Sequence, residues 1–302
     1  MSAKTVENKV NAAWKKICPQ NEFPTFIQES FLASNTDLPR FYYLIKTHKA
    51  SPDIKMRPIV SNINGPTQRI SWLHALKPML KNVPAHLENS LELIRCIPSG
   101  DLTTNKALPY SCSLDVVSLY TKIPIQEAIT KATDRILNPV LHLCRQDVSD
   151  LLQVALNNMY FSFIDQVFSP KRGPTCMASR ISGTLAILFM DNLETIALSS
   201  HLMINPYKRY VDDIYLQTIN EETSHHFHDV INNVHPNLKF EIEKPETTSS
   251  GLSLSLLDFK VTISKDGNSS FEFYKKTPKK PLFVHHQSAM PTKSKLNFIG
   301  NE

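Results

Sequence analysis

The sequence predicts an α+β protein in which an antiparallel sheet is backed by helices. Two observations support this class: apolar residues recur at helical spacing in several segments, and short runs of β-branched and aromatic residues stand between those segments. With 302 residues, 41% of them hydrophobic, the chain can bury a large core without disulfides or metal ions. No internal repeat is evident. We therefore expect one continuous domain.

The first part of the chain predicts a helix, a basic hairpin and a second helix. Residues 1–39 are expected to form a peripheral lead-in, with a short helix over residues 6–17. Residues 41–45 and 57–60 are rich in strand formers and are separated by a proline-containing turn, which favours a hairpin. Apolar side chains at helical spacing then predict a helix over residues 67–80.

The rest of the chain continues this alternation of strands and helices. A predicted strand over residues 113–120 contains a carboxylate, Asp115, and another predicted hairpin has Asp212 and Asp213 at its tip. The other predicted elements are helices over residues 123–137, 145–158, 181–199 and 221–234, and strands over residues 160–163, 166–168, 208–211, 214–217, 239–242, 254–263 and 271–274.

Charge is distributed unevenly, although the net charge is only +5. Residues 40–81 carry eight basic side chains against one acid, and residues 271–302 carry six against two. Residues 82–270 between them are acidic, with 15 basic and 21 acidic side chains. Two basic flanks would suit a polyanion and an acidic middle would suit metal ions, but solvated lysine-rich surfaces give the same counts.

Several classes of protein are not supported. The longest apolar run, residues 184–190, is shorter than the roughly 20 residues that span a bilayer, and the N-terminus lacks the pattern of a signal peptide. We therefore expect no membrane association. The five cysteines are scattered and form no C-x-x-C pair, which favours free thiols in an intracellular compartment. His225, His226 and His228 are more simply interpreted as surface histidines than as metal ligands.

Three carboxylates are the candidate catalytic and metal-binding residues: Asp115, Asp212 and Asp213. Adjacent acids are common in turns, so the pair alone indicates little. If the strand with Asp115 lies beside the hairpin, however, three hard oxygen donors converge, and such a set suits two Mg²⁺ ions, with Mn²⁺ as an alternative. Two ions about 4 Å apart would activate a primer 3′-hydroxyl and stabilise the departing pyrophosphate.

Six short motifs follow one another in this chain, at residues 46–49, 57–60, 113–120, 180–190, 209–213 and 256–258. In this order they resemble the Penelope-like retroelement reverse transcriptases, which are related to telomerase reverse transcriptase. The resemblance covers about residues 38–300. The Tyr-x-Asp-Asp box is shared by many reverse transcriptases, whereas its combination with the basic hairpin and the Asp-Val-Val-Ser-Leu-Tyr block is specific to this family.

The resemblance implies a right-hand polymerase with fingers, an RNA-recognition-like palm and a truncated thumb. Fingers and palm would interleave over residues 40–264, and residues 265–302 would hold the end of the primer grip and part of the thumb. A C-terminal GIY-YIG nuclease, where the family has one, would lie beyond Glu302. We therefore expect a fragment or gene remnant, or a member that extends existing 3′ ends.

The resemblance also assigns roles to individual side chains. Asp115, Asp212 and Asp213 match the catalytic carboxylates, and a lysine near the next strand, either Lys239 or Lys244, would protonate pyrophosphate. The expected nucleotide-binding residues are Lys46, Arg57, Tyr120, Met177 and Ala178, and the expected nucleic-acid-binding residues are Lys49, Lys275, Lys276, Lys279 and Lys280. In the resemblance, the Tyr120 ring would exclude a 2′-hydroxyl and so select deoxynucleotides; the alternative is that Tyr120 is a core residue. For Lys46 and Arg57, the alternative is a solvated basic hairpin with no ligand.

One loop departs from the family pattern. Pro170 stands where a glutamine is expected, and Ala178 stands where a glycine is expected. A Cβ there would crowd a close backbone approach, which puts turnover and fidelity in question. The spacing from Gly173 to Met177 is also one residue longer than in the family.

The sequence thus predicts an RNA-directed DNA polymerase of a retroelement, with an RNA template, a DNA primer and dNTPs as partners. The alternative is a catalytically impaired remnant that binds nucleic acid without polymerising. An RNA-dependent RNA polymerase is disfavoured by Tyr120 and by the family resemblance. We expect a nuclear location, because elements of this kind must reach chromosomal DNA.

Overall fold

The computed structural model describes residues 1–18, 23–45, 56–72, 74–97, 110–139, 142–170, 180–199 and 204–274. Its helices are α1 (Ala3–Ile17), α2 (Thr25–Ser30), α3 (Ser90–Cys96), α4 (Leu119–Lys122), α5 (Ile125–Thr133), α6 (Arg145–Asn157), α7 (Arg180–Ser199) and α8 (Glu221–Val234), with 3-10 helices η2 (Ile70–Trp72) and η3 (His74–Asn82). Its strands are β1 (Arg40–Ile45), β2 (Met56–Ser61), β3 (Tyr110–Val116), β4 (Phe161–Phe163), β5 (Gln166–Phe168), β6 (Tyr207–Tyr210), β7 (Asp213–Thr218), β8 (Phe240–Glu243), β9 (Glu246–Thr248), β10 (Gly251–Leu256), β11 (Phe259–Ile263) and β12 (Ser269–Phe273).

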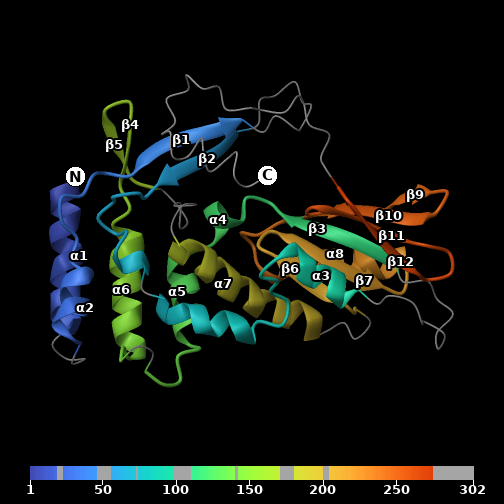
Figure 1. Ribbon diagram of the computed structural model, residues 1–302, viewed down its shortest axis with the longest axis horizontal. Helices are drawn as coiled ribbons and strands as arrows, with labels where there is room; N and C mark the ends of the chain where they lie inside the picture. Colours follow the sequence, from blue (N-terminus) through green and yellow to red (C-terminus); the bar gives the residue numbers. More distant parts are fainter. Residues whose placement is uncertain are drawn as a thin grey trace.

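The strands in the described part of the chain form three four-stranded sheets (Figure 1). The hairpin sheet has the order β2-β1-β4-β5, the central sheet β6-β7-β3-β8 and the C-terminal sheet β12-β11-β10-β9. All pairings in the central sheet are antiparallel, and helices α7 and α8 cover it, so the α+β class is confirmed.

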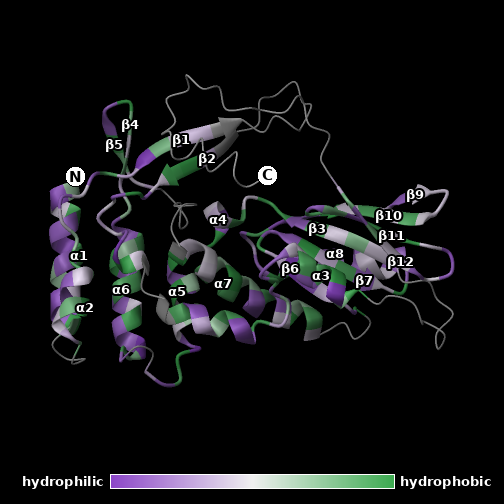
Figure 2. Ribbon diagram, in the orientation of Figure 1, coloured by the Kyte–Doolittle hydropathy of each residue, from purple (hydrophilic) through white to green (hydrophobic). Residues whose placement is uncertain are grey.

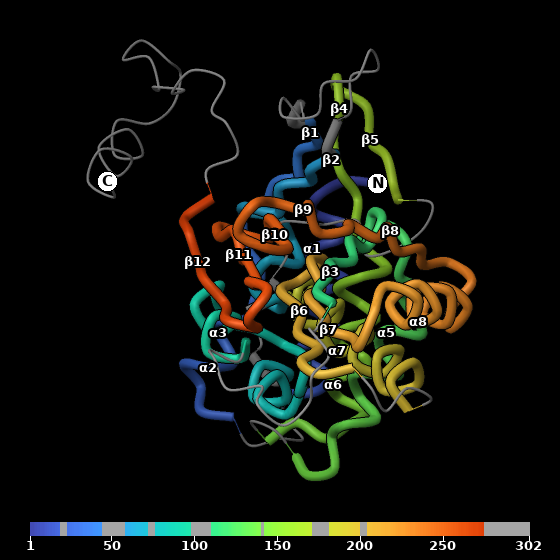
Figure 3. Tube along the Cα trace, turned by 90° about the vertical axis from the view of Figure 1, so that its right-hand side faces the viewer, coloured from blue at the N-terminus to red at the C-terminus, as the bar shows by residue number. Residues whose placement is uncertain are grey.

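The central sheet is buried on both faces because its residues alternate between two hydrophobic layers. One face carries Leu114 and Ile214, which pack against α7 and α8. The other face carries Tyr215, which packs against α3 and against β10 and β11 of the C-terminal sheet. Figure 3 shows β10 and β11 beside the central strands on the side away from α8.

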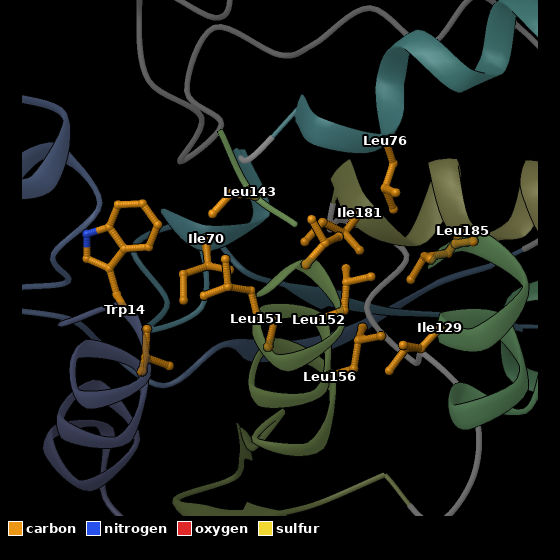
Figure 4. Packing of buried hydrophobic residues seen from close by; sticks show 14 of the residues in the cluster. Trp14, Ile70, Leu76, Ile129, Leu143, Leu151, Leu152, Leu156, Ile181 and Leu185 are labelled. Carbon is orange, nitrogen blue, oxygen red and sulfur yellow. The ribbon is translucent and has the colours of Figure 1, made fainter. Parts of the chain in front are cut away.

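A second core joins the helices at the other end of the molecule (Figure 4). Trp14 of α1 is 1% exposed and packs in this core, and α1 lies against α6. Burial of one large apolar side chain contributes about 1.5–3 kcal/mol. The expected lead-in helix is therefore longer than predicted, and one face of it packs into this core.

Helix α7 connects the two cores. It is hydrophobic along much of its length (Figure 2), and Leu185 and Phe189 belong to different cores. By length and composition Ile181–Ser199 would also suffice to cross a membrane, but 67% of the most apolar window is buried inside the protein, as in the core helix of many proteins.

Several further predicted elements differ from the structure. The predicted helix over residues 67–80 is replaced by 3-10 turns around η2 and η3; Pro78 lies inside η3 and cannot donate a helical hydrogen bond. The predicted strand over residues 254–263 is a hairpin, because Leu257 adopts a left-handed φ of 53° between β10 and β11. The strand over residues 113–120 begins earlier and ends at Val116.

Candidate active site

The candidate site lies at one end of the central sheet. Asp115 of β3 is directly opposite Asp213, the first residue of β7, and Glu241 of β8 flanks Asp115 on its other side. Directly opposed residues project from the same face with Cβ atoms about 4.5–5.5 Å apart. The register of the sheet therefore places acidic residues from three strands side by side. Like charges in such positions repel one another, and a cation relieves that repulsion.

Asp212 lies in the two-residue turn that joins β6 to β7. Tyr210 pairs with Asp213, so Val211 and Asp212 are the central residues of the turn, and the predicted turn is shifted by one residue. The amide of Val116 donates to the Asp212 carbonyl at 3.1 Å. This bond ties the turn to the end of the strand that carries Asp115.

The backbone of the turn is conformationally unusual. Val211 has a φ of 57°, a left-handed conformation that is rare for a β-branched residue. Such a residue costs about 1–3 kcal/mol and persists only where its surroundings hold it. The turn is therefore maintained by contacts outside itself.

Tyr120 lies in α4, immediately beyond the candidate carboxylates. The chain leaves β3 after Val116, because Ser118 adopts a left-handed φ of 55° and precedes the first turn of α4. Burial and the negative charge of Asp212 both raise the pKa of the Tyr120 hydroxyl, so the ring lies within electrostatic range of the turn. The ring also packs against the core beneath the central sheet. The structure thus confirms that the Tyr120 ring packs on the core, while its role in selecting the sugar stays a prediction.

A buried ion pair beneath the turn was not predicted. Arg209 of β6 and Glu194 of α7 have side chains that are 0% and 2% exposed. Arg209 Nε lies 2.5 Å from Glu194 Oε1, and Nη2 lies 3.1 Å from Oε2. Tyr207 donates to the same carboxylate at 3.0 Å. In the sequence, Glu194 could have been noticed because it and Asp191 interrupt the apolar face of the 181–199 helix.

A polar cluster lies farther along the face of the sheet that carries Asp115 and Asp213, opposite the face of the Arg209–Glu194 pair. The Tyr215 hydroxyl lies 3.0 Å from Ser111 Oγ, and Gln217 donates to that hydroxyl at 2.8 Å. Burial raises the pKa of Tyr215 to about 12, so the phenol stays protonated near neutral pH. This cluster is covered by the C-terminal sheet, whereas Asp115, Asp212 and Asp213 are only partly buried at the sheet end.

A cavity of about 760 Å³ adjoins this end of the sheet. It is lined by Val117 and by residues of the segments that follow β3 and precede β8, among them the two lysines Lys122 and Lys239. The amide of Val117 donates to the Lys239 carbonyl at 2.9 Å, so Lys239 lies at the Asp115 end of β8. Lys244 follows the opposite end of β8 and pairs with Glu221 at 2.7 Å.

Several predicted site residues lie outside the described part of the chain. Arg57 is described only by its backbone, which pairs with Leu44 in the hairpin sheet. The predicted residues outside the described ranges are Lys46, Lys49, Met177, Ala178, Lys275, Lys276, Lys279 and Lys280.

His228, one of the three clustered histidines, contacts the Phe240 carbonyl at 2.7 Å and thereby links α8 to β8.

Within the described ranges, no three His, Cys, Asp or Glu side chains form a group that could hold a metal ion as they stand. The backbone nevertheless juxtaposes Asp115 and Asp213, and it ties Asp212 to the end of β3. Carboxylate oxygens are the donors that Mg²⁺ prefers, so the residue types would suit magnesium, and a metal site at this end of the sheet stays a prediction.

Comparison with known proteins identifies the fold. No protein-family model and no curated protein matches this sequence. Among solved structures, telomerase from Candida tropicalis truncated from its C-terminal domain matches with a TM-score of 0.53 and 14% identity, over 78% of this chain and 55% of that chain. Telomerase from Candida albicans, in complex with a TWJ fragment of telomeric RNA, matches with a TM-score of 0.55 and 12% identity, over 87% of this chain and 50% of that chain.

An RNA-dependent RNA polymerase shares the same architecture with a slightly lower TM-score. The BmCPV RNA-dependent RNA polymerase at quiescent state matches with a TM-score of 0.50 and 12% identity, over 86% of this chain and 25% of that chain. The chain therefore has a polymerase fold of the reverse-transcriptase type. It spans about half the length of the telomerase chains that it matches. At these identities the likeness shows the fold alone.

Proposed function

We propose that this chain is the fingers and palm, with part of a thumb, of an RNA-directed DNA polymerase from a Penelope-like retroelement. The observation that carries the proposal is the register of the central sheet, which sets Asp115 opposite Asp213 and ties Asp212 to the end of β3 in a polymerase fold. The bound telomeric RNA of the Candida albicans telomerase supports an RNA template for this chain as well. A DNA primer, dNTPs and a nuclear location complete the proposal.

The proposed chemistry needs little from the protein beyond placement. Asp115, Asp212 and Asp213 would hold two Mg²⁺ ions, which supply activation of the primer 3′-hydroxyl and neutralisation of the leaving pyrophosphate. Tyr120 would exclude a 2′-hydroxyl; the influence of the Asp212 charge on its pKa and its packing against the core support this role. Lys46 and Arg57 would bind the triphosphate, Met177 and Ala178 would line the nucleotide site, and Lys49, Lys275, Lys276, Lys279 and Lys280 would track the nucleic-acid backbone.

Primer extension tests this function. On an RNA template with a DNA primer, dNTPs and Mg²⁺, we expect Asp212→Ala to reduce DNA synthesis at least about 1,000-fold, because the loss of a metal ligand removes several kcal/mol of transition-state stabilisation. Asp229→Ala is the matched control, since the Asp229 side chain is 78% exposed on α8. Equal synthesis by wild type and Asp212→Ala, or incorporation of ribonucleotides in preference to deoxynucleotides, would contradict the proposal.

Lys239 is the better candidate for the general acid, because it lies at the Asp115 end of β8 beside the 760 Å³ cavity. We expect Lys239→Ala to lower the rate of nucleotide incorporation about 100-fold, within the usual range of general-acid catalysis. Lys244→Ala removes a lysine that pairs with Glu221 and should leave the rate within about twofold. Rapid-quench kinetics measures both rates. A larger loss from Lys244→Ala would reverse the assignment.

The second candidate function is a remnant that binds nucleic acid without polymerising. The substitutions at Pro170 and Ala178 favour it, because they change the loop that positions the templating base in the family. Wild-type protein that binds an RNA–DNA primer-template but leaves the primer unextended, at any Mg²⁺ or Mn²⁺ concentration, would establish this second function.

A further inference from the structure

The buried Arg209 guanidinium contacts the turn as well as Glu194. Its Nη1 donates to the Val211 carbonyl at 3.2 Å, and its Nη2 donates to the Ile187 carbonyl of α7 at 3.2 Å. The two pairs of atoms shared with Glu194 make a bidentate ion pair, the geometry in which arginine binds a carboxylate most specifically. The guanidinium therefore bridges α7 and the turn.

The charge of this buried pair is compensated inside the protein. Burial by itself lowers the pKa of the guanidinium, but the Glu194 carboxylate outweighs that effect, so the net pKa of Arg209 is raised. The backbone of Arg209 is also fixed: its amide donates to the Ala85 carbonyl at 2.6 Å, and its carbonyl accepts from the Leu87 amide at 2.9 Å. Because both its backbone and its guanidinium are hydrogen-bonded, the Arg209 side chain has a fixed position.

Both central carbonyls of the turn are consequently bonded to groups outside it. Arg209 holds that of Val211, and the Val116 amide holds that of Asp212. Val211 is the residue with the left-handed φ of 57°, so Arg209 binds the residue whose conformation most needs support from outside the turn.

We propose that the Glu194–Arg209 ion pair fixes the conformation of the Val211–Asp212 turn. By doing so, it fixes the position of the Asp212 carboxylate beside Asp115. The link from this ion pair to metal binding rests on the proposed function. Arg209 and Glu194 are positioning residues in this account, because they act on the candidate metal ligands through the backbone of the turn. A buried ion pair often adds little to the free energy of unfolding, so we test its role in positioning instead of its role in stability.

The test replaces the ion pair by apolar side chains of similar size. Such replacements are often neutral or stabilising, so the protein is expected to fold. The Tyr207 hydroxyl would lose its acceptor in Glu194, and we therefore compare Tyr207→Phe alone with Tyr207→Phe combined with Glu194→Leu and Arg209→Met. Tyr207→Phe is the matched control, because it keeps both the ion pair and the bond to Val211.

The first measurement is independent of metal and of activity. Amide hydrogen exchange of Val116, whose N–H donates to Asp212, reports whether the turn is held. We expect the triple variant to exchange this amide at least about tenfold faster than Tyr207→Phe, while the amide of Val261 in the C-terminal sheet keeps its rate. Equal exchange at Val116 would overturn the proposal whether or not the protein polymerises.

The second measurement follows Mn²⁺ binding by electron paramagnetic resonance. We expect the triple variant to bind Mn²⁺ about 10–100-fold more weakly than Tyr207→Phe, the usual effect of losing a group that orients metal ligands. Faster exchange with unchanged Mn²⁺ affinity would contradict the step from the turn to the carboxylates. If wild type neither binds Mn²⁺ nor extends a primer, the proposed function fails, and the exchange result still decides whether Arg209 locks the turn.

Discussion

The central sheet and the hairpin sheet are both four-stranded, but they are buried to different extents. In the central sheet, Leu114 and Tyr215 lie on opposite faces and each is 1% exposed. In the hairpin sheet, Tyr42 and Tyr43 lie on opposite faces and are 45% and 49% exposed. Its inner rings pack against one another, as in the stacking of Phe41 on Phe161 at 5.5 Å between ring centroids.

This difference in burial suggests different uses for the two sheets. A site built on strands that are buried on both faces has its geometry fixed by packing; Asp115 and Asp213 stand on such strands, and Asp212 lies in the turn that joins two of them. Exposed aromatic rings cost stability little to present and are available for stacking on nucleic-acid bases. Under the proposed function, the central sheet would therefore hold the reacting groups, and the hairpin sheet would contact the nucleic acid.

The largest effect should follow from a change within the central sheet. Leu114→Ala leaves a cavity between the sheet and α7 and is expected to lower the free energy of unfolding by about 2–5 kcal/mol. The matched control is Leu91→Ala, because Leu91 is 54% exposed on α3 and should change that free energy by less than about 0.5 kcal/mol. Urea denaturation followed by circular dichroism measures both. Equal losses would remove the contrast between the buried sheet and the surface.

A smaller effect on stability is expected in the hairpin sheet. Tyr42→Ala removes a ring that is 45% exposed and should change the free energy of unfolding by less than about 0.5 kcal/mol. If the ring stacks on a template base, the same variant should weaken binding of single-stranded RNA by about fivefold or more. Phe26→Ala, at a ring that is 71% exposed on α2, is the control for binding. RNA affinity that is the same for both variants would argue against a binding role for Tyr42.

Local sequence patterns predicted the elements better than their ends and partners. The hairpin of β1 and β2 and the long helix α7 follow from strand formers, turn residues and helical spacing, and the structure confirms them. The end of β3 was missed because it depends on a left-handed Ser118, which no propensity indicates.

For the candidate site, the structure tests where the predicted residues lie and leaves their roles as predictions. Asp115 is far in sequence from the adjacent pair Asp212 and Asp213, and the sheet register places Asp115 opposite Asp213, as the predicted site requires. Their catalytic role stays a prediction. The ion pair of Arg209 with Glu194 joins a strand to a helix through tertiary packing, so neither periodicity nor spacing along the chain specifies it.

The most direct test of the account is a crystal structure of the protein with Mn²⁺. We predict an anomalous difference peak within coordination distance of carboxylate oxygens of both Asp115 and Asp212, at the end of β3 where the Val116 amide binds the turn. The same crystals of Asp212→Ala should lack that peak. A fully occupied Mn²⁺ ion elsewhere, with no density between Asp115 and Asp212, would contradict the claim that this end of the central sheet is a metal site.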